Sequence, residues 1–405
     1  MKILSLACAL MLAALPAIAL EKPRDWRPPA PETVPNFREE WRNVVIELAS
    51  YAKTRKPGFV VLVRGGSELF VKGEREVEWD EVRDPDGKTF EKRLPLRSVF
   101  RPYVKVLDGM VVDGLYCGDD AFGQPLDKTV KDRLALDAKL SEEKAQGIQR
   151  PPVPQQFGPF SIDPKEELRK AAEVKRVAER LERQRRLVYA VDALRSQGRT
   201  ILSIENCRNQ KEVDAAYKAA ERDRVLSYAA VNDEDLTHLQ RGHPRNENAQ
   251  PVITVTGARN WMPLLRADRF GNKAEWLMAM ERTNHDAMLI DVTHRGADPL
   301  TKDEVKRLRF KELGAPRLML AVLPVGRAYD WRWYWQKGWG AGNPSFLFAP
   351  DTDDPGSFIT AVSDPQWKEM LGKYLVGIMD LGFDGVVLDD LDTYLWFEEL
   401  MPLGG

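Results

Sequence analysis

Short apolar runs alternate with amphipathic helical patterns along most of this chain, and the alternation predicts an α/β fold. Eight of the runs lack regular polar alternation, as expected of strands that are buried on both faces of a parallel sheet. They comprise residues 59–63, 109–113, 200–204, 225–229, 252–256, 287–290, 318–323 and 386–388. Eight strands separated by helices predict one closed (β/α)8 barrel of the TIM type, extending over residues 36–400.

Helix boundary signals support this reading. Asp364 and Pro365 begin a helical pattern that Gly382 can end, and Thr301 with Glu304 forms a capping box. Further helices are predicted from Asn36 and near residues 210–222 and 272–283. Two segments interrupt the rhythm: a hairpin within residues 71–94, turning at 84–87, and a mostly charged helical stretch at 125–197, broken by a loop at 151–154. We expect both to be insertions in the barrel.

The N-terminal residues predict export. Lys2, the apolar run 3–15 and Ala17-Ile18-Ala19 are typical of a secretory signal peptide over residues 1–19, followed by a Pro-rich spacer at 20–35. A single-span anchor and a lipoprotein linked through Cys8 are the alternatives. The mature protein is therefore expected to be secreted or periplasmic, without a membrane span. Cys117 and Cys207 either pair or remain two buried thiols.

Charge and residue clusters exclude several function classes. The net charge of −2 gives no basic footprint for nucleic acid. The four histidines are scattered and predict neither a zinc site nor a catalytic relay. The run Asp389-Asp390-Leu391-Asp392 lacks the further oxygen ligands of a recognised cation loop, so neither a metal nor another cofactor is expected.

Candidate chemistry gathers at the carboxyl ends of the predicted strands, where barrel enzymes hold their active sites. Asp389 follows the last strand, and Asp113, Glu205 and Asp291 follow three others. Asp392 reads equally well as a helix cap or as a site residue.

Several ordered motifs in residues 261–399 resemble glycoside hydrolase family 114, the endo-α-1,4-polygalactosaminidase type. Residues 283–291 are similar to the family's "TNYDLLIID", and residues 326–335 to "GEAEDYRYYW". Residues 364–367 resemble "DPEW", and 382–394 resemble "GFDGVYLDIIDAY". The resemblance implies a barrel that binds a polysaccharide or oligosaccharide.

Residues 36–240 resemble the other half of the same family, but they precede the motifs that they ordinarily follow. The resemblance therefore implies a circularly permuted barrel. In this interpretation residues 36–240 form the family's second half, 251–400 its first half, and 241–250 the loop that joins the family's original ends. A duplicated second domain is the alternative, but eight strands suffice for one barrel only.

Within the family, the expected catalytic pair is the Asp that ends "LLIID" and the Glu of "GEAED". Asp291 matches the Asp, whereas Arg327 occupies the position of the Glu. Arg cannot donate a proton, so another carboxyl has to be the acid: Asp389 or another carboxylate near a strand end, namely Asp113, Glu205 or Asp330. The substrate-binding candidates are Arg64, Asp113, Glu205, Arg327, Tyr329, Asp330, Asp392 and Tyr394.

Two functions remain open at this point. One is hydrolysis of an α-linked polysaccharide, and the other is carbohydrate binding by a barrel that has lost catalysis. Arg327 at the mouth is expected to disfavour a cationic amino-sugar polymer. The aromatic run Trp331, Trp333, Tyr334, Trp335 and Trp339 either stacks on sugar rings or packs against the barrel.

Overall fold

The computed structural model describes residues 33–73, 76, 79–83, 89–93, 98–118, 164–240 and 242–401. The predicted signal peptide, most of the Pro-rich spacer, the turn at 84–87 and the loop at 151–154 lie outside these residues. In the described part of the chain, no helix is sufficiently long and apolar to traverse a bilayer.

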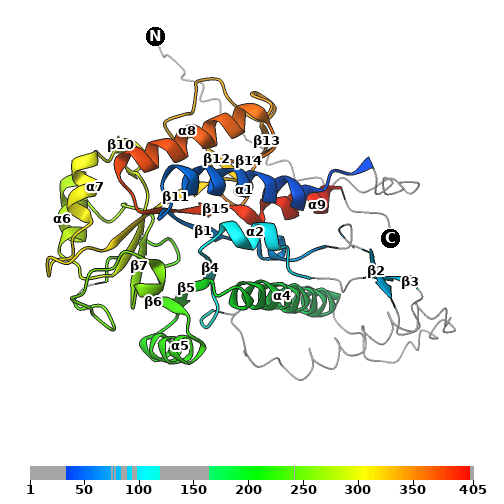
Figure 1. The fold of residues 1–405 in the computed structure, drawn as a ribbon, viewed down its shortest axis with the longest axis horizontal. Coiled ribbons are helices and arrows are strands. Elements are labelled where there is room, and N and C mark those ends of the chain that lie inside the picture. Colours follow the sequence, from blue (N-terminus) through cyan, green and yellow to red (C-terminus); the bar gives the residue numbers. More distant parts are fainter. Residues whose placement is uncertain are drawn as a thin grey trace, which may run out of the picture.

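Eight parallel strands form one sheet that curls into a nearly closed barrel surrounded by helices (Figure 1). Its order is β6-β5-β4-β1-β15-β11-β8-β7, so the first strand lies between β4 and the last strand. The strands are β1 (Val60–Arg64), β4 (Gly109–Asp113), β5 (Thr200–Cys207), β6 (Leu226–Val231), β7 (Trp261–Leu264), β8 (Ala287–Ile290), β11 (Leu318–Pro324) and β15 (Gly385–Asp389).

The barrel has one seam, between β6 and β7. These two strands are the ends of the sheet order and share no ladder among the described residues. The chain just beyond them closes the gap in part, since the Leu236 carbonyl accepts hydrogen bonds from the amides of Leu265 and Arg266 at 3.1 and 3.3 Å.

Helices cover the outside of the barrel, and their ends follow the predicted signals. The Asn36 side chain caps α1, Asp364 caps α8, Gly382 ends α8 with φ 96°, and Thr301 with Glu304 forms the capping box of α7. The helices are α1 (Phe37–Arg55), α2 (Arg101–Val106), α4 (Pro164–Ser196), α5 (Gln210–Asp223), α6 (Lys273–Glu281), α7 (Lys302–Leu308), α8 (Pro365–Leu381) and α9 (Tyr394–Leu400), with short 3-10 turns η2 (Ser67–Phe70), η4 (Val255–Gly257) and η5 (Leu391–Thr393).

One predicted strand is wrong. Residues 252–256 are not a strand: the Val252 amide bonds to the Pro316 carbonyl, and Ile253 is 74% exposed. The strand is β7 instead, a few residues later. Pro263 lies within β7, and proline is unusual in a central strand because it has no N–H to donate to a neighbouring strand. It is tolerated here because β7 is an edge strand of the sheet.

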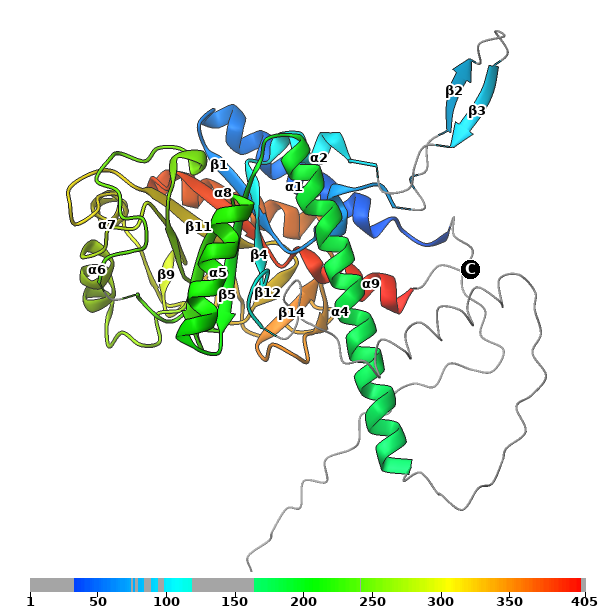
Figure 2. The ribbon, with the colours of Figure 1, turned by 90° about the horizontal axis from the view of Figure 1, so that it is seen from below.

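Other strands lie outside the barrel sheet. After β11 the chain forms a three-stranded antiparallel sheet of β12 (Arg327–Tyr329), β14 (Ser357–Thr360) and β13 (Leu347–Pro350). The predicted hairpin is present as β2 (Trp79–Arg83) and β3 (Thr89–Arg93), and it stands away from the barrel, as does one end of α4 (Figure 2). The short strands β9 (Thr293–His294) and β10 (Asp298–Pro299) pair with each other.

Cys117 and Cys207 form a disulfide with a Cα–Cα distance of 5.0 Å, which decides between the two readings of these thiols. The bond ties the loop after β4 to the end of β5. It therefore fixes the loop that directly follows Asp113.

Candidate functional site

Arg64, at the end of β1, joins two strand-end carboxylates. Its Nε and Nη2 donate to Asp113 at 2.8 and 3.1 Å, and its Nη1 donates to Asp389 at 3.0 Å. Burial opposes the charge of Arg64, but the charges of Asp389 and Asp113 outweigh it and raise the pKa of the guanidinium. The ends of β4, β1 and β15 are thus held together at the mouth of the barrel.

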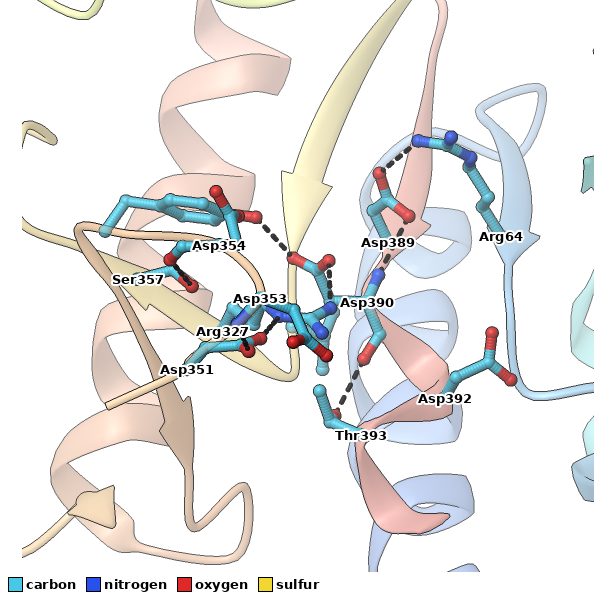
Figure 3. Close-up of polar contacts among 12 residues, drawn as sticks. Arg64, Arg327, Asp351, Asp353, Asp354, Ser357, Asp389, Asp390, Asp392 and Thr393 are labelled. Carbon is cyan, nitrogen blue, oxygen red and sulfur yellow. Dashed lines mark hydrogen bonds and ion pairs between the residues drawn. The ribbon is translucent and has the colours of Figure 1, made fainter. Parts of the chain in front are cut away.

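Asp390 follows β15 in a left-handed conformation, with φ 61°. Its amide donates to Asp389 Oδ1 at 2.8 Å. A non-glycine residue in this region is strained, and such strain persists where the surroundings enforce it. The turn directs the Asp390 side chain toward Arg327 and away from Arg64 (Figure 3).

Arg327, on β12, bridges two carboxylates: its Nη1 donates to Asp390 at 2.8 Å and its Nε to Asp351 at 2.7 Å (Figure 3). The Tyr329 hydroxyl donates to the other Asp390 oxygen at 3.3 Å. Burial, reinforced by the charge of Asp389, raises the pKa of the Asp390 carboxyl to about 6, although Arg327 opposes the shift. Asp390 therefore releases its proton at a higher pH than an ordinary aspartate.

Asp291 follows β8 and is 6% exposed. One oxygen accepts from the amide and hydroxyl of Thr293 at 3.0 and 2.9 Å, and the other from Arg332 Nη2 at 2.8 Å. The Arg332 guanidinium also lies 5.5 Å from the centre of the Tyr329 ring. Because the Tyr329 hydroxyl bonds to Asp390, a continuous set of contacts links Asp291 to Asp390.

Glu205 points away from this group. In the parallel register Ile204 lies opposite Asp113, so the next residue of β5 faces the other side of the sheet. Its Oε2 accepts from the amides of Tyr116 and Cys117 at 2.8 and 2.9 Å, beside the disulfide. Burial raises its pKa to about 7. The structure therefore does not bring Glu205 together with the other predicted site residues.

The remaining candidates lie at the edge of the group or outside it. Asp392 turns away from Arg327 (Figure 3) and accepts from the Gly66 amide at 2.8 Å, and burial raises its pKa. Tyr394 is fully buried, and its hydroxyl donates to Glu68 at 3.3 Å. Asp330 is exposed, with its amide bonded to the Gly356 carbonyl. Among the aromatics, Tyr334 is buried, whereas Trp331 and Trp333 are 46% and 55% exposed.

Sequence reasoning missed Asp390, Arg332 and Asp351 as members of the site. Asp390 was visible only as part of an acidic run, and nothing in that run showed that a left-handed turn separates it from Asp389. Arg332 lies between Trp331 and Trp333, in a run whose aromatic side chains alone suggested a function. Among the described residues, no three His, Cys, Asp or Glu side chains are grouped to hold a metal ion.

The arrangement offers two kinds of carboxyl at the mouth. Asp291, Asp389 and Asp390 are all in ion pairs, with Arg332, Arg64 and Arg327 respectively, but burial raises the pKa of Asp390 to about 6. Neighbouring carboxyl groups held in different environments are the arrangement that proton-transfer chemistry requires.

No protein-family model matches the chain. It is 42% identical over 78 residues to an uncharacterized protein of Deinococcus radiodurans and 33% identical over 81 residues to one of Thermotoga maritima, covering 19% and 20% of this chain. It is 26% identical over 154 residues, or 38% of its length, to an uncharacterized protein of Methanocaldococcus jannaschii. The matches span 25%, 25% and 43% of those relatives' own lengths.

Proposed function

We propose that this protein hydrolyses glycosidic bonds in a polysaccharide, with Asp390 as the proton donor. The observation that carries the proposal is the position of Asp390, which directly follows β15 at the barrel mouth and contacts Arg327 and Tyr329, and burial raises its pKa. The protonated carboxyl gives its proton to the glycosidic oxygen as the bond from that oxygen to the anomeric carbon breaks. Asp291 then either attacks the anomeric carbon or removes a proton from the attacking water.

In this assignment Asp389 is a positioning residue. Its Oδ1 accepts the Asp390 amide and its other oxygen is paired with Arg64, so it holds the left-handed turn and its charge raises the pKa of Asp390. Asp390 thereby takes the role of acid that the sequence assigned to Asp389.

Arg327 is compatible with this chemistry even though it replaces the acidic residue of the resembled family. Its charge is compensated by Asp351 and Asp390, at 2.7 and 2.8 Å. Because the charge is neutralised locally, it gives no reason to exclude a cationic amino-sugar polymer. Galactosaminoglycan therefore stays among the substrates to be tested.

The decisive experiment measures reducing ends released from a broad glycan panel, including partly deacetylated galactosaminoglycan, between pH 5 and 7. We expect Asp390→Asn to lower the rate by roughly 10²–10⁴-fold, because it removes the acid. Asp353→Asn is the matched control, since Asp353 is an exposed carboxylate near the same group. Absence of release by the unmodified protein, or equal rates in the two variants, would refute the assignment.

A second candidate is a carbohydrate-binding barrel without catalysis. It is favoured by the arginines that pair with Asp291 and Asp390 and can hold both carboxyls in place. In that case the protein binds ligands on a glycan array, hydrolyses none of them, and binds equally well after Asp390→Asn.

We also propose that the barrel is circularly permuted relative to the family that it resembles. The seam between β6 and β7 supports this, because the chain that connects these two strands includes residues 241–250, which the resemblance identifies as the joined ends. Export is proposed as well, supported by the Cys117–Cys207 disulfide, since such bonds persist in oxidising compartments. Cell fractionation that recovers the protein only from the cytoplasm would contradict export.

A further inference from the structure

Two tryptophans of the aromatic run at residues 331–339 are exposed. Trp331 and Trp333 are 46% and 55% exposed, whereas the other three rings of the run are buried or partly buried. A single exposed apolar side chain is common and needs no explanation. The two tryptophans differ, however, in the residues that their rings contact, and this difference indicates a function for Trp331.

The Trp331 ring lies against the side chains that hold the two proposed catalytic carboxyls. Its centre is 5.3 Å from the centre of the Tyr329 ring, whose hydroxyl bonds to Asp390. The guanidinium of Arg332, which is paired with Asp291, lies over one face of the Trp331 ring, 4.5 Å from its centre. One side chain therefore separates the Trp331 ring from each of the two carboxyls.

Gly296, in the turn between β9 and β10, makes room for the Trp331 ring. A Cβ at Gly296 would lie 2.4 Å from Trp331 Cε3, so a side chain at this position would displace the ring. Gly296 also has a φ of 74°, which favours glycine. Trp331 is thus packed along one edge and covered on one face, and the rest of its ring is open to solvent.

A fixed, half-exposed indole ring suits one residue of a pyranose sugar. The C–H groups on one side of a pyranose pack on an aromatic face, while its hydroxyls remain at the rim in contact with water. Arg332 beside the ring is paired with Asp291, so the ligand has to carry hydroxyl groups near these charges as well as an apolar face. Because the Trp331 ring is already held in place, little side-chain entropy is lost when a sugar packs on it.

We propose that Trp331 is the platform of a sugar-binding subsite, which adjoins the position of bond cleavage and takes one pyranose residue of the glycan. The inference rests on the proposed glycan substrate but not on its hydrolysis. Trp333 lies outside this subsite. Its ring contacts Tyr334 and Tyr374, and Tyr374 belongs to α8 on the outside of the barrel. Trp333 is therefore a matched control, with the same side chain and a similar exposure.

The test measures glycan binding by isothermal titration calorimetry, using the full chain with Asp390→Asn so that no ligand is consumed. The probes are oligosaccharides of partly deacetylated galactosaminoglycan, maltohexaose and oligogalacturonate, and sorbitol is the counterpart that has hydroxyls but no pyranose ring. We expect Trp331→Ala to weaken binding of at least one glycan roughly ten-fold and Trp331→Phe, which keeps a smaller ring, about three-fold. Trp333→Ala should bind within about two-fold of the parent. Thermal melting verifies that the variants fold.

Kinetics with Asp390 intact separate binding from positioning. A sugar on the Trp331 ring makes the same contact in the ground state and in the transition state, so Trp331→Ala should raise KM roughly ten-fold with little change in kcat. If the ring served only to position Arg332 and Asp291, the same variant would lower kcat instead.

The possible results distinguish the subsite from the proposed hydrolysis. The subsite is overturned if Trp331→Ala and Trp333→Ala bind glycan equally well, if sorbitol binds as tightly as the glycans, or if Trp331→Ala lowers kcat alone. Binding that depends on Trp331, without release of reducing ends, would overturn hydrolysis and leave the subsite standing. Absence of binding to every glycan of the panel would overturn both.

Discussion

Asp390 and Glu205 each carry a largely buried carboxyl with a raised pKa, but the two contact different parts of the molecule. Asp390 contacts Arg327 and Tyr329 at the mouth of the barrel, and its side chain is 13% exposed. Glu205 contacts the backbone of the loop that the disulfide holds. We therefore expect the first to affect activity and the second to affect stability.

Replacing Arg327 tests the role of Asp390. Arg327 lowers the pKa of Asp390, so Arg327→Met should raise that pKa above about 6 and keep the acid protonated to higher pH. The alkaline limb of the pH–rate profile is then expected to move upward. Arg327→Lys retains the positive charge and should leave the limb closer to its original position. A limb that stays in place in Arg327→Met would argue against Asp390 as the donor.

Glu205 should make the protein less stable as the pH rises. Its pKa is 4.5 as an unperturbed group and about 7 in the folded protein, so the folded state binds more protons between these values. The contribution of Glu205 to the free energy of unfolding is fully present below pH 4.5. About 3 kcal/mol of this free energy is lost as the pH rises through 7. We expect Glu205→Gln to remove most of this slope in urea unfolding between pH 4.5 and 7.5. An unchanged slope would contradict the assignment.

At the level of elements, the turn from β11 to β12 determines where Asp390 lies. A Cβ at Gly326 would be 1.8 Å from the Thr393 hydroxyl and 2.2 Å from the Asp390 carbonyl. Only glycine allows the two backbones this approach. The approach brings Arg327, directly after Gly326, within reach of the Asp390 side chain.

Gly326→Ala should therefore displace Asp390. We expect a loss of about 1–3 kcal/mol in the free energy of unfolding and at least a ten-fold fall in the rate of reducing-end release. Gly372→Ala, in α8, is the control, because a Cβ there meets nothing within 4 Å. It should stabilise the protein by about 0.5–1 kcal/mol with no change in rate. Equal effects of the two variants would mean that the close approach is not needed.

The disulfide is an element-scale constraint, because it joins residues 90 positions apart. Cys117→Ser with Cys207→Ser should lower the free energy of unfolding by about 2–5 kcal/mol, measured in urea under oxidising conditions. The parent protein with its disulfide reduced is the comparison and should lose a similar free energy of unfolding. A double variant as stable as the parent would show that the loop is held mainly by Glu205.

The sequence predicted the elements better than their side-chain partners. Buried apolar runs and capping residues identified seven of the eight barrel strands and the ends of α1, α7 and α8, because these signals are local. The predicted strand at 252–256 was wrong because its β-branched residues do not pair with a neighbouring strand. The strand β7 was not predicted, because Pro263 is an unusual residue within a strand. The site was predicted in part, since strand ends indicate Asp291 and Asp389. The role of Asp390 depends on a left-handed turn and on Arg327, 63 residues away, which no local pattern reports.

At the scale of the whole molecule, the first helix, α1, contacts the last helix, α9, just as the first barrel strand pairs with the last. Arg38 of α1 forms two hydrogen bonds with Glu398 of α9, at 2.7 and 2.9 Å, and the rings of Phe37 and Phe397 lie 5.2 Å apart. The two ends of the described barrel are therefore neighbours, which makes the permutation testable.

A re-permuted chain should fold. It begins at Gly242, joins Met401 to Asn36 through a short Gly/Ser linker, omits residues 1–35 and ends at Arg241. Because Gly242 and His243 are exposed, we expect a cooperative melting transition and activity close to that of the parent. A chain opened at Gly377, inside α8, is the control and should not fold. Failure of the first chain alongside an intact parent would contradict the permuted-barrel interpretation.

The pairing of β1 with β15 has a consequence for synthesis. Arg64 and Asp389 are 325 residues apart, so at about 5–20 residues per second a ribosome needs roughly 15–65 s to make the strand that covers the second edge of β1. Until then the nascent chain carries an uncovered apolar edge, the kind of surface that invites aggregation. The cell must shield that edge with a chaperone, or move the polypeptide across a membrane before it folds.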